Sequence, residues 1–545
     1  MGLEQMDGPY GYDARPSDAR SAYANSAYAT PLTEDMPDLG DIPAMPALPP
    51  NGFPKPTNGL EKPANGDSKP VEHIKIPREI RAVKDAESYE PTGKNIVICL
   101  DGTGDQFDAD NSNIVHFVSC LKKAVPEQVT YYQSGIGTYD GGGVTNGINA
   151  GLDMAVGSGL GVHIRDAYMF IQAHYKQGDK ICLLGFSRGA YTARCLAGMI
   201  HKILEPNDHP ANNSKPFAYK YYKDDTDEGW AMSQEFRKTF CIPVNVYFVG
   251  VFDSVASVGF FPRKLPLSST PTHRAQYFRH AMALDEHRAK FKACRYKVKD
   301  SMGEKYTVSA EEDIVDTDAR EVWFTGCHAD VGGGAVKNEV RHKLAQIPLR
   351  WMIRQCFECD TGIIFKTPML ANEGLDIHTL WPRYEPLSIP AGPPPPDMLD
   401  RYHKGLLGPI HRRSSLLEPV DHNDEYGMHH LKIYKETDSE KPSADLHEHW
   451  TPEQVEDYFD ALQKVNDQLV DAKGWWILEL WPIKIRHQAK DSDNWVKKVG
   501  LNLGTYRAVQ DKAPNLHWTV KHRTDQMEYR VRTRMDRNAE WRVVV

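Results

Sequence analysis

Long apolar runs and an excess of basic charge are both missing from this sequence. Nowhere in its 545 residues is there the run of about 18 apolar residues that a membrane-spanning helix needs. The N-terminus has neither a basic start nor an apolar stretch, so we expect no secretory signal peptide. Asp and Glu outnumber Lys and Arg by 74 to 65, which gives a net charge of −9 and excludes a general attraction to nucleic acid. We therefore expect a cytoplasmic protein that binds no nucleic acid.

Cysteine is also scarce. Nine cysteines in a chain of this length are too few for a disulfide framework, and their odd number favours a reducing compartment. Cys356 and Cys359 form the only close pair, and the second pair that a zinc site would need is absent. We expect these two cysteines to lie on a helix without a function, and we expect no metal and no other cofactor.

The first segment, residues 1–90, is rich in Pro, Gly and Asn and poor in periodic apolar residues. Such a segment cannot bury enough surface to order itself, so it is expected to be a disordered N-terminal arm. Arms of this composition can act as linkers or as ligands of other domains. The sequence does not indicate which protein partner, if any, this arm would have.

Residues 91–370 alternate short apolar, β-branched runs with segments of helical periodicity. Runs such as NIVICL, KICLLGF and VYFVGVF are continuous rather than alternating, which is typical of strands buried on both faces. Strands that alternate with helices predict an α/β fold, a mostly parallel sheet with helices on both faces. This stretch is expected to be the catalytic core.

The rest of the chain divides into a loop-rich insertion or cap, 371–472, and a small β-rich segment, 473–545. The insertion is proline-rich and contains one clear helix, with Thr451 as its N-cap. The C-terminal segment carries 15 Lys and Arg against 8 Asp and Glu. Its tryptophans and basic residues could contact an anionic membrane surface. The segment lacks the periodicity of a surface-active helix, which favours the alternative that the tryptophans are core and the charges a solvated sheet edge.

The most informative short stretch is Gly185-Phe186-Ser187-Arg188-Gly189. It follows an apolar strand-like run, and a helix-like segment begins at once. In the Gly-x-Ser-x-Gly pattern, the glycines let a strand turn directly into a helix around an exposed serine. A plain tight turn would need no serine at its centre. The strand before and the helix after it favour Ser187 as a nucleophile.

A serine nucleophile needs a base, and on this type of sheet the order along the chain is Ser, then Asp or Glu, then His. Asp253 ends the run VYFVGVF, and His328 follows the run VWFTG. Both lie where a buried strand opens into a loop, which is where such folds place their chemistry. We expect His328 to be the general base and Asp253 to fix its tautomer and stabilise the imidazolium.

Alternatives exist for both partners. An aspartate after a strand often caps the next helix, and Asp285 or Asp330 would then replace Asp253 as the acid. His280 and His287 are the rivals of His328, but they lie on a helical pattern that favours a structural role.

The oxyanion of an acyl transfer would be bound by the backbone N–H of Arg188, the residue after the nucleophile, and by a donor from an early strand-end loop. The loop LDGTGD is such a loop. Gly102 and Thr103 could supply the second amide, and Asp101 could orient the loop or Arg188.

The same loop permits a second interpretation. An aspartate after an apolar strand, followed by Gly-Thr, is also found in enzymes that form an aspartyl-phosphate. Those enzymes need a second acid two residues later, a position that Thr103 occupies here, while Asp105 comes two residues too late. The loop therefore favours the oxyanion role.

Several blocks of this sequence, in order, resemble one family. They are VICLDGTGD, YYQSGIGT, IRDAYMFI, LLGFSRGAYTAR, VGVFDSVASVG, RHAMALDEHRAKF, VWFTGCHADVGGG and IPLRWMIRQC, spread over residues 93–356. They are similar to the signature blocks of an uncharacterised α/β-hydrolase family that is common in fungi and also forms the catalytic domain of bacterial type VI secretion phospholipase effectors.

The resemblance implies a Ser-Asp-His esterase, and in the bacterial effectors a phospholipase. It implies Ser187 as nucleophile, His328 as base and Asp253 as acid, and it places Asp101, Gly102 and Thr103 in the family's first block. Cys327 and Ala329 stand where the family usually has other small residues. A role as a secreted toxin is not implied.

The main hypothesis is therefore a serine hydrolase that cleaves acyl esters of phospholipids or other lipids through an acyl-enzyme. Two alternatives remain: a non-catalytic binding or scaffold protein on a hydrolase fold, and an esterase or thioesterase for a non-lipid substrate. A retired enzyme would be free to lose the Ser, Asp and His residues, which weighs against the scaffold.

Overall fold

The structure is a computed structural model. It describes residues 76–102, 107–135, 160–202, 215–241, 244–255, 275–296, 317–390, 392–404, 428–429, 450–489 and 494–545. Most of the predicted N-terminal arm and Thr103 lie outside these residues. Residues 76–90 are among the described residues, and the predicted arm is too long because it includes them. Ile76 and Ile80 are buried, and Glu79–Arg81 pairs as a strand with Ile364–Lys366.

An eight-stranded sheet forms the centre of the fold, in the order β16-β14-β8-β7-β6-β5-β3-β4. Every neighbouring pair in it is parallel. The expected α/β fold with a mostly parallel sheet is therefore confirmed. Its strands are β3 (Asn95–Leu100), β4 (Gln128–Gln133), β5 (Lys180–Phe186), β6 (Val246–Phe252), β7 (Tyr277–Ala283), β8 (Asp318–Phe324), β14 (Asn515–His517) and β16 (Arg542–Val544).

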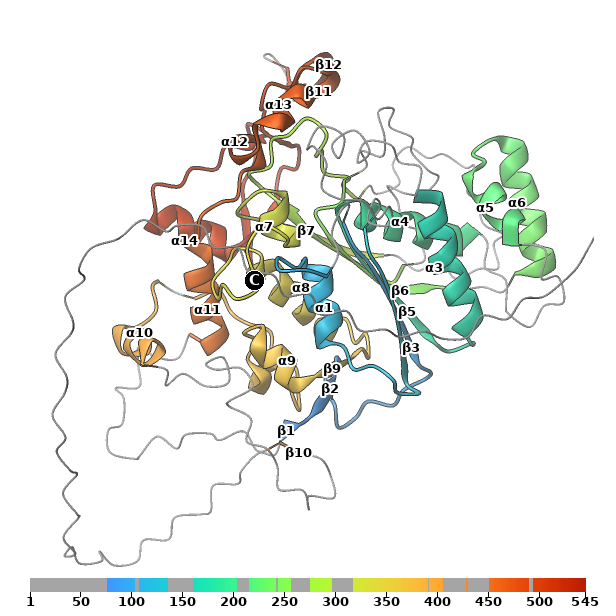
Figure 1. Cartoon of the computed structure of the whole chain (residues 1–545), viewed down its shortest axis with the longest axis horizontal. Coiled ribbons are helices and arrows are strands. Elements are labelled where there is room, and N and C mark those ends of the chain that lie inside the picture. The colour runs from blue at the N-terminus through green and yellow to red at the C-terminus, as the bar shows by residue number, and fades with distance from the viewer. Residues whose placement is uncertain are drawn as a thin grey trace, which may run out of the picture. The chain divides into compact units, whose positions relative to one another are not determined.

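Both faces of the sheet are covered, as the alternation along β3 shows. Ile96, Ile98 and Leu100 pack with α3 (Leu160–His174) and α4 (Ser187–Lys202) in one apolar cluster. Val97 and Cys99 pack with α1 (Asn113–Cys120) and α8 (Gln346–Glu358) in another. Because neither face of β3 meets water, this strand is apolar from Ile96 to Leu100. Figure 1 shows α3 and α4 beside strands β3, β5 and β6.

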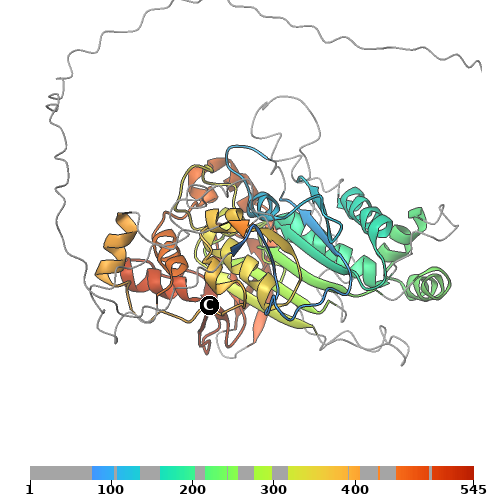
Figure 2. The ribbon, with the colours of Figure 1, turned by 90° about the horizontal axis from the view of Figure 1, so that it is seen from below.

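Further helices surround this core. In both views, α5 and α6 lie at the opposite end of the protein from α10 (Figures 1 and 2). The remaining helices are α5 (Lys215–Lys223), α6 (Asp227–Phe240), α7 (His328–Gly332), α9 (Thr367–Asn372), α10 (Pro396–His403), α11 (Pro452–Ala461), α12 (Gln468–Asp471), α13 (Trp476–Glu479), α14 (Trp518–Gln526) and the 3₁₀ turns η1 (Ile377–Thr379) and η4 (Lys473–Trp475).

Four two-stranded pairings complete the structure. They are β1 (Ile76–Pro77) with β10 (Met428–His429), β2 (Glu79–Arg81) with β9 (Ile364–Lys366), β11 (Pro482–Gln488) with β12 (Trp495–Leu501), and β13 (Ala508–Val509) with β15 (Arg534–Met535). The expected small β-rich C-terminal segment is present, but it also supplies β14 and β16 to the central sheet.

The segment 371–472 is fastened to the core through α11. Thr451 caps this helix as predicted, and Gln454 closes the capping box. Arg354 of α8 forms a buried bidentate ion pair with Glu453 of α11, with both N–O distances at 2.7 Å. Charge-assisted, paired contacts of this kind fix one helix against another.

The cysteine pair lies at the end of α8, where Cys356 is helical and Cys359 is the C-cap residue. Both are buried. In the parts of the chain that the structure describes, no cluster of His, Cys, Asp and Glu could hold a metal ion. Within the same parts, no helix is both long enough and apolar enough to cross a membrane.

Candidate active site

Ser187 lies at a sharp turn between a strand and a helix. Strand β5 ends at Phe186 and α4 begins at Ser187. Ser187 has a φ of +58°, a left-handed conformation that a serine rarely adopts and that marks functional sites. This is the backbone geometry of a nucleophile elbow.

The two glycines of the elbow are there because the backbone passes too close for a side chain. A Cβ at Gly185 would lie 2.6 Å from the carbonyl oxygen of Gly189. A Cβ at Gly189 would lie 2.2 Å and 2.3 Å from the carbonyl oxygens of Leu100 and Asp101. The first turn of α4 is therefore pressed against the end of β3, which only glycine permits.

Three residues predicted from strand ends meet at one edge of the sheet. His328 Nε2 lies 2.7 Å from Ser187 Oγ, and His328 Nδ1 lies 2.5 Å from Asp253 Oδ2. Asp253 directly follows β6, and His328 begins α7 just after β8. Because β5, β6 and β8 run parallel, their carboxyl ends share this edge. All three side chains are buried or nearly so.

The electrostatics of Asp253 depend on a residue that the sequence did not indicate. Arg507 donates to both carboxylate oxygens, at 2.6 Å to Oδ1 and 2.8 Å to Oδ2. Ala283 N also donates to Oδ1. Burial alone would raise the pKa of Asp253, but the guanidinium of Arg507 and the hydrogen bond to His328 hold it well below its usual range.

Arg507 reaches this position from the C-terminal segment. Its guanidinium also donates to the carbonyl oxygens of Ala283 and Phe291, so it fills a site built from the loops after β6 and β7. In the sequence it is one of 15 basic residues in 473–545. No local pattern distinguishes it, because its partner lies 254 positions earlier.

His328 is enclosed by aromatic rings. The ring of Phe186 lies 4.8 Å away in a tilted arrangement, and the ring of Phe291 lies 4.8 Å away edge-on. Burial lowers the pKa of His328, and the hydrogen bond to Asp253 partly offsets this. The imidazole is therefore neutral at pH 7 and able to accept a proton.

A buried ion pair supports the His328 backbone. Glu286 accepts the N–H of His328 at 3.2 Å and pairs with Arg288 at 2.8 Å. Burial would raise the pKa of Glu286, but Arg288 lowers it to about 2. Glu286 therefore stays charged and holds the start of α7.

The rival histidines do not contact Ser187. His280 lies in strand β7, not on the helical pattern expected from the sequence. Its Nδ1 lies 2.9 Å from Glu321, and its Nε2 accepts the backbone N–H of Ser254. His287 lies 2.8 Å from Asp467 through Nε2. Both have structural partners.

The alternative acids also have other partners. Asp285 accepts the backbone N–H of Gly326 and the hydroxyl of Tyr529. Asp330 accepts from Cys327 N and from Asn466, and burial raises its pKa to about 6.

The loop after β3 is organised around Asp101. Its carboxylate accepts from Ser112 Oγ at 2.7 Å, Tyr132 Oη at 2.9 Å and Gly102 N at 2.8 Å. Burial raises its pKa, and these hydrogen bonds oppose the rise. The amide of Gly102 is thus engaged by Asp101 in this structure. Arg188 is in the first turn of α4, directly after Ser187.

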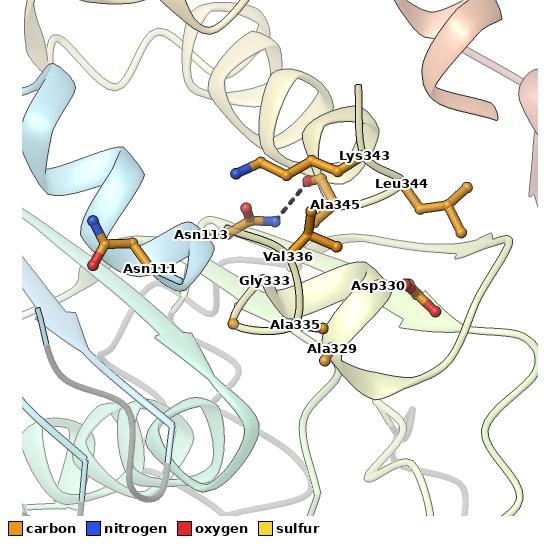
Figure 3. Close-up of a pocket in the computed structure, with 11 residues that line it drawn as sticks. Asn111, Asn113, Ala329, Asp330, Gly333, Ala335, Val336, Lys343, Leu344 and Ala345 are labelled. Carbon is orange, nitrogen blue, oxygen red and sulfur yellow. Dashed lines mark hydrogen bonds between the residues drawn. The ribbon is translucent and has the colours of Figure 1, made fainter. Parts of the chain in front are cut away.

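A small pocket lies beside α7. Figure 3 shows it lined by residues 111, 113, 329, 330, 333–336 and 343–345. Asn113 donates across it to the carbonyl oxygen of Ala345 at 2.8 Å. Neither Ser187 nor His328 lines this pocket, so it is separate from the nucleophile.

Comparisons with known proteins agree with the sequence blocks. The chain is 25% identical over 560 residues to "Uncharacterized protein YEL023C" of Saccharomyces cerevisiae, covering 79% of each chain. Among solved structures, it is similar to an uncharacterized protein from Pseudomonas aeruginosa at 16% identity, with a TM-score of 0.30, covering 50% of this chain and 46% of that one. It is also similar to the Tle1 effector bound to the VgrG spike of the type 6 secretion system, at 20% identity, with a TM-score of 0.26, covering 47% of this chain and 53% of that one.

The chain thus spans about half the length of each of those solved chains. Residues 94–355 match the family model described as "T6SS, Phospholipase effector Tle1-like, catalytic domain". This segment contains Ser187, Asp253 and His328, whereas Arg507 lies outside it. The resemblance to the family that includes the type VI secretion phospholipase effectors is therefore confirmed over residues 94–355.

Proposed function

We propose that this protein is a serine hydrolase that cleaves acyl ester bonds of phospholipids, with Ser187, His328 and Asp253 as its catalytic triad. The observation that carries the proposal is the hydrogen-bonded series Ser187–His328–Asp253 at the carboxyl ends of parallel strands. The left-handed conformation of Ser187 supports it. The lipid substrate comes from the description of the matching family.

The reaction would proceed in two acyl transfers. As Ser187 Oγ attacks the ester carbonyl carbon, His328 Nε2 takes its proton, and the same proton then passes to the departing alcohol. This leaves an acyl group on Ser187. His328 then takes a proton from water as the water oxygen attacks that acyl group, and returns this proton to Ser187 Oγ as the fatty acid leaves. Only side chains of this chain and water take part.

Asp253 would act by position and charge. It accepts the Nδ1–H of His328, so that Nε2 faces Ser187 as the acceptor. Its carboxylate stabilises the imidazolium that forms during each transfer. Arg507 would be a positioning residue, because it touches Asp253 and not the reacting atoms.

The oxyanion would be stabilised by the backbone N–H of Arg188 and by the loop of Gly102 and Thr103. Gly189 packs directly against the backbone at Leu100 and Asp101, which keeps this loop beside the elbow. Because Gly102 N donates to Asp101, the loop would have to release this amide, or use Thr103, to supply the second donor.

We also propose that residues 91–370 form the catalytic core, and that 371–472 and 473–545 complete it rather than fold apart. The ion pair between Arg354 and Glu453 and the placement of β14 and β16 in the central sheet support this division.

Turnover of phospholipid vesicles and of a panel of soluble acyl esters would test the function. We expect release of fatty acid by the natural chain and at least about a thousandfold less by Ser187→Ala. Ser233→Ala, at a buried serine of α6, is the matched control. A fluorophosphonate probe should label the natural chain and not Ser187→Ala. Absence of serine-dependent release from every ester would favour the binding-protein alternative, and release from non-lipid esters alone would refute the phospholipid assignment.

A further inference from the structure

Several large apolar side chains are exposed on α13, directly after it, and on and next to the β11–β12 hairpin. Ile477 and Leu480 are 61% and 62% exposed, and Val499 is 70% exposed. Leu501 and Leu503 are 43% and 54% exposed. Single exposed apolar residues are normal on a protein surface, but a group of them marks an interaction site. These five residues are called the C-terminal ridge below.

A buried carboxylate holds the two parts of the ridge together. Glu479, at the end of α13, is fully buried. It accepts the side-chain amide of Asn502 at 2.6 Å and the backbone N–H of Gly504 at 2.9 Å. Asn502 lies between Leu501 and Leu503 in the sequence, so the turn that carries these leucines is fastened to the helix that carries Ile477 and Leu480. These hydrogen bonds therefore hold the two parts of the ridge in fixed positions relative to each other.

Basic side chains continue the ridge along the hairpin. Val499 pairs with Lys484 across the two strands, and Leu501 pairs with Pro482. Side chains alternate along a strand, so Lys497 shares the face of Val499 and Lys484, and all three are exposed. The described residues of the hairpin, 482–489 and 494–501, contain no Asp or Glu.

Acidic groups do lie at the far end of the hairpin. There Trp495 Nε1 donates to Asp536 at 3.0 Å, and Asp536 is buried. The four residues that join the strands, 490–493, add one Lys and two Asp. The part of the hairpin next to the exposed apolar residues of the ridge is therefore basic.

The ridge also adjoins the proposed active site. Trp475, which directly precedes α13, packs edge-on against Phe291, with ring centroids 5.4 Å apart. Phe291 in turn packs against His328 at 4.8 Å. Arg288 lies over both Phe291 and Trp475. Phe291 and Trp475 therefore connect the proposed base to the start of the helix that carries Ile477.

We propose that the C-terminal ridge docks this protein on an anionic phospholipid surface. The apolar side chains would enter the boundary between headgroups and acyl chains, and Lys484 and Lys497 would face the lipid phosphates. Exposed apolar side chains beside lysines, on strands whose described residues contain no Asp or Glu, suit such a surface better than a protein partner, whose interfaces are depleted of lysine. This inference deepens the proposed function and rests on it, since docking would present lipid esters near Ser187.

Vesicle co-sedimentation of the full chain tests the proposal. Ser187→Ala serves as the parent protein, so that the vesicles are not consumed. We expect it to bind vesicles of phosphatidylcholine with phosphatidylserine more tightly than phosphatidylcholine alone, and to be released by salt. Replacing Ile477, Leu480 and Val499 together by Ser should weaken partitioning at least about tenfold. The double variant with Lys484→Gln and Lys497→Gln should bind anionic vesicles about tenfold more weakly, and its binding to neutral vesicles should not change.

Met232→Ser is the matched control, because Met232 is 51% exposed on α6, far from α13 in Figure 1. It should leave vesicle binding unchanged. Melting temperatures of all variants check that each one folds. Unchanged vesicle binding by the folded ridge variant would overturn the proposal. So would a dimer that the ridge variant converts to a monomer without any change in vesicle binding, because the ridge would then join two copies.

Failure of the docking proposal and failure of the proposed function give different results. Hydrolysis of a short-chain, water-soluble ester by the natural chain reports on Ser187 without any lipid surface. Ester hydrolysis without ridge-dependent vesicle binding would overturn the docking surface and leave the hydrolase standing. Ridge-dependent vesicle binding without hydrolysis of any ester would support docking and refute the hydrolase.

Discussion

At the scale of single residues, the guanidinium of Arg507 weakens the effect of the Asp253 carboxylate on the pKa of His328. A carboxylate beside an imidazole raises the pKa of the imidazole, and a guanidinium on the same carboxylate counteracts this effect. Burial already lowers the pKa of His328. Glu286 and Arg288 also face His328, and their effects oppose each other. We therefore expect His328 to stay neutral, and active as a base, well into mildly acidic solution.

Replacing Arg507 by Gln should move the acid limb of the pH profile of kcat/KM. Activity requires neutral His328, so it is lost as the pH falls through the pKa of this residue. Without the guanidinium, Asp253 stabilises the imidazolium more strongly and the pKa of His328 rises. The limb should therefore shift to higher pH. The plateau should also fall by about tenfold or more, because Asp253 loses two of its hydrogen bonds.

Arg507→Lys separates charge from geometry. Lys keeps a positive charge but cannot form the bidentate pair, so the limb should stay in place while the plateau falls. A role for Arg507 in folding alone would reduce the active fraction of both variants and move neither limb. That result would contradict its assignment as a positioning residue.

These residues also show what the sequence could and could not predict. Ser187, Asp253 and His328 each end a continuous apolar run, and parallel strands bring such ends to one edge of a sheet. Their proximity therefore follows from the position of each residue at the end of a strand-like run in the sequence. The pairing of Arg507 with Asp253 depends on how 473–545 folds back onto the core, and no local pattern contains that information.

At the scale of elements, the elbow between β5 and α4 depends on its close packing. Gly189→Ala would place a methyl group against two backbone carbonyl oxygens of the β3 end. Backbone cannot move aside as a side chain can, so we expect a loss of about 1–3 kcal/mol in the free energy of unfolding, with loss of esterase activity. Gly500→Ala, where nothing lies within 4 Å, is the control. Equal stability of both variants by chemical denaturation would contradict the elbow geometry.

The contact between α8 and α11 is a second element-scale feature with a measurable effect. Arg354→Met would leave Glu453, which is 1% exposed, without its ion pair. An uncompensated buried charge costs about 3–5 kcal/mol, and we expect a loss of this size in urea denaturation. Lys238→Met removes an exposed i,i+3 pair with Glu235 and should cost under about 1 kcal/mol. Similar losses for both would show that α11 is not held by Arg354.

Some elements were not predicted, for identifiable physical reasons. The stretch around His280 has apolar residues at helical spacing, yet it forms β7. A strand buried on both faces has no polar alternation, so periodicity cannot separate it from a buried helix. The short strand β2, and the place of β14 and β16 in the central sheet, were not predicted for another reason. Three residues are too few to carry a pattern, and they form because neighbouring strands offer edges to pair with.

At the scale of the whole molecule, the site is assembled from more chain than the family segment contains. Residues 94–355 supply the proposed triad, but the sheet continues beyond β8 into β14 and β16, and Arg507 precedes β14 by only a few residues. The C-terminal segment therefore covers one edge of the sheet and also pairs the proposed acid. Activity and the integrity of the sheet are linked through it.

A chain that ends at residue 472 should lose both properties. It would expose the β8 edge, which favours aggregation, and leave Asp253, which is fully buried, without Arg507. We expect low soluble yield and no labelling by a fluorophosphonate probe. A chain lacking residues 1–70, which lie outside the described residues, should still be labelled at Ser187. Adding residues 473–545 as a separate polypeptide to the chain that ends at residue 472 should restore some labelling. This restoration should fail when the added polypeptide carries Arg507→Gln. Full labelling of the chain that ends at 472 would show that the family segment needs no C-terminal partner and that Arg507 contributes nothing to the site.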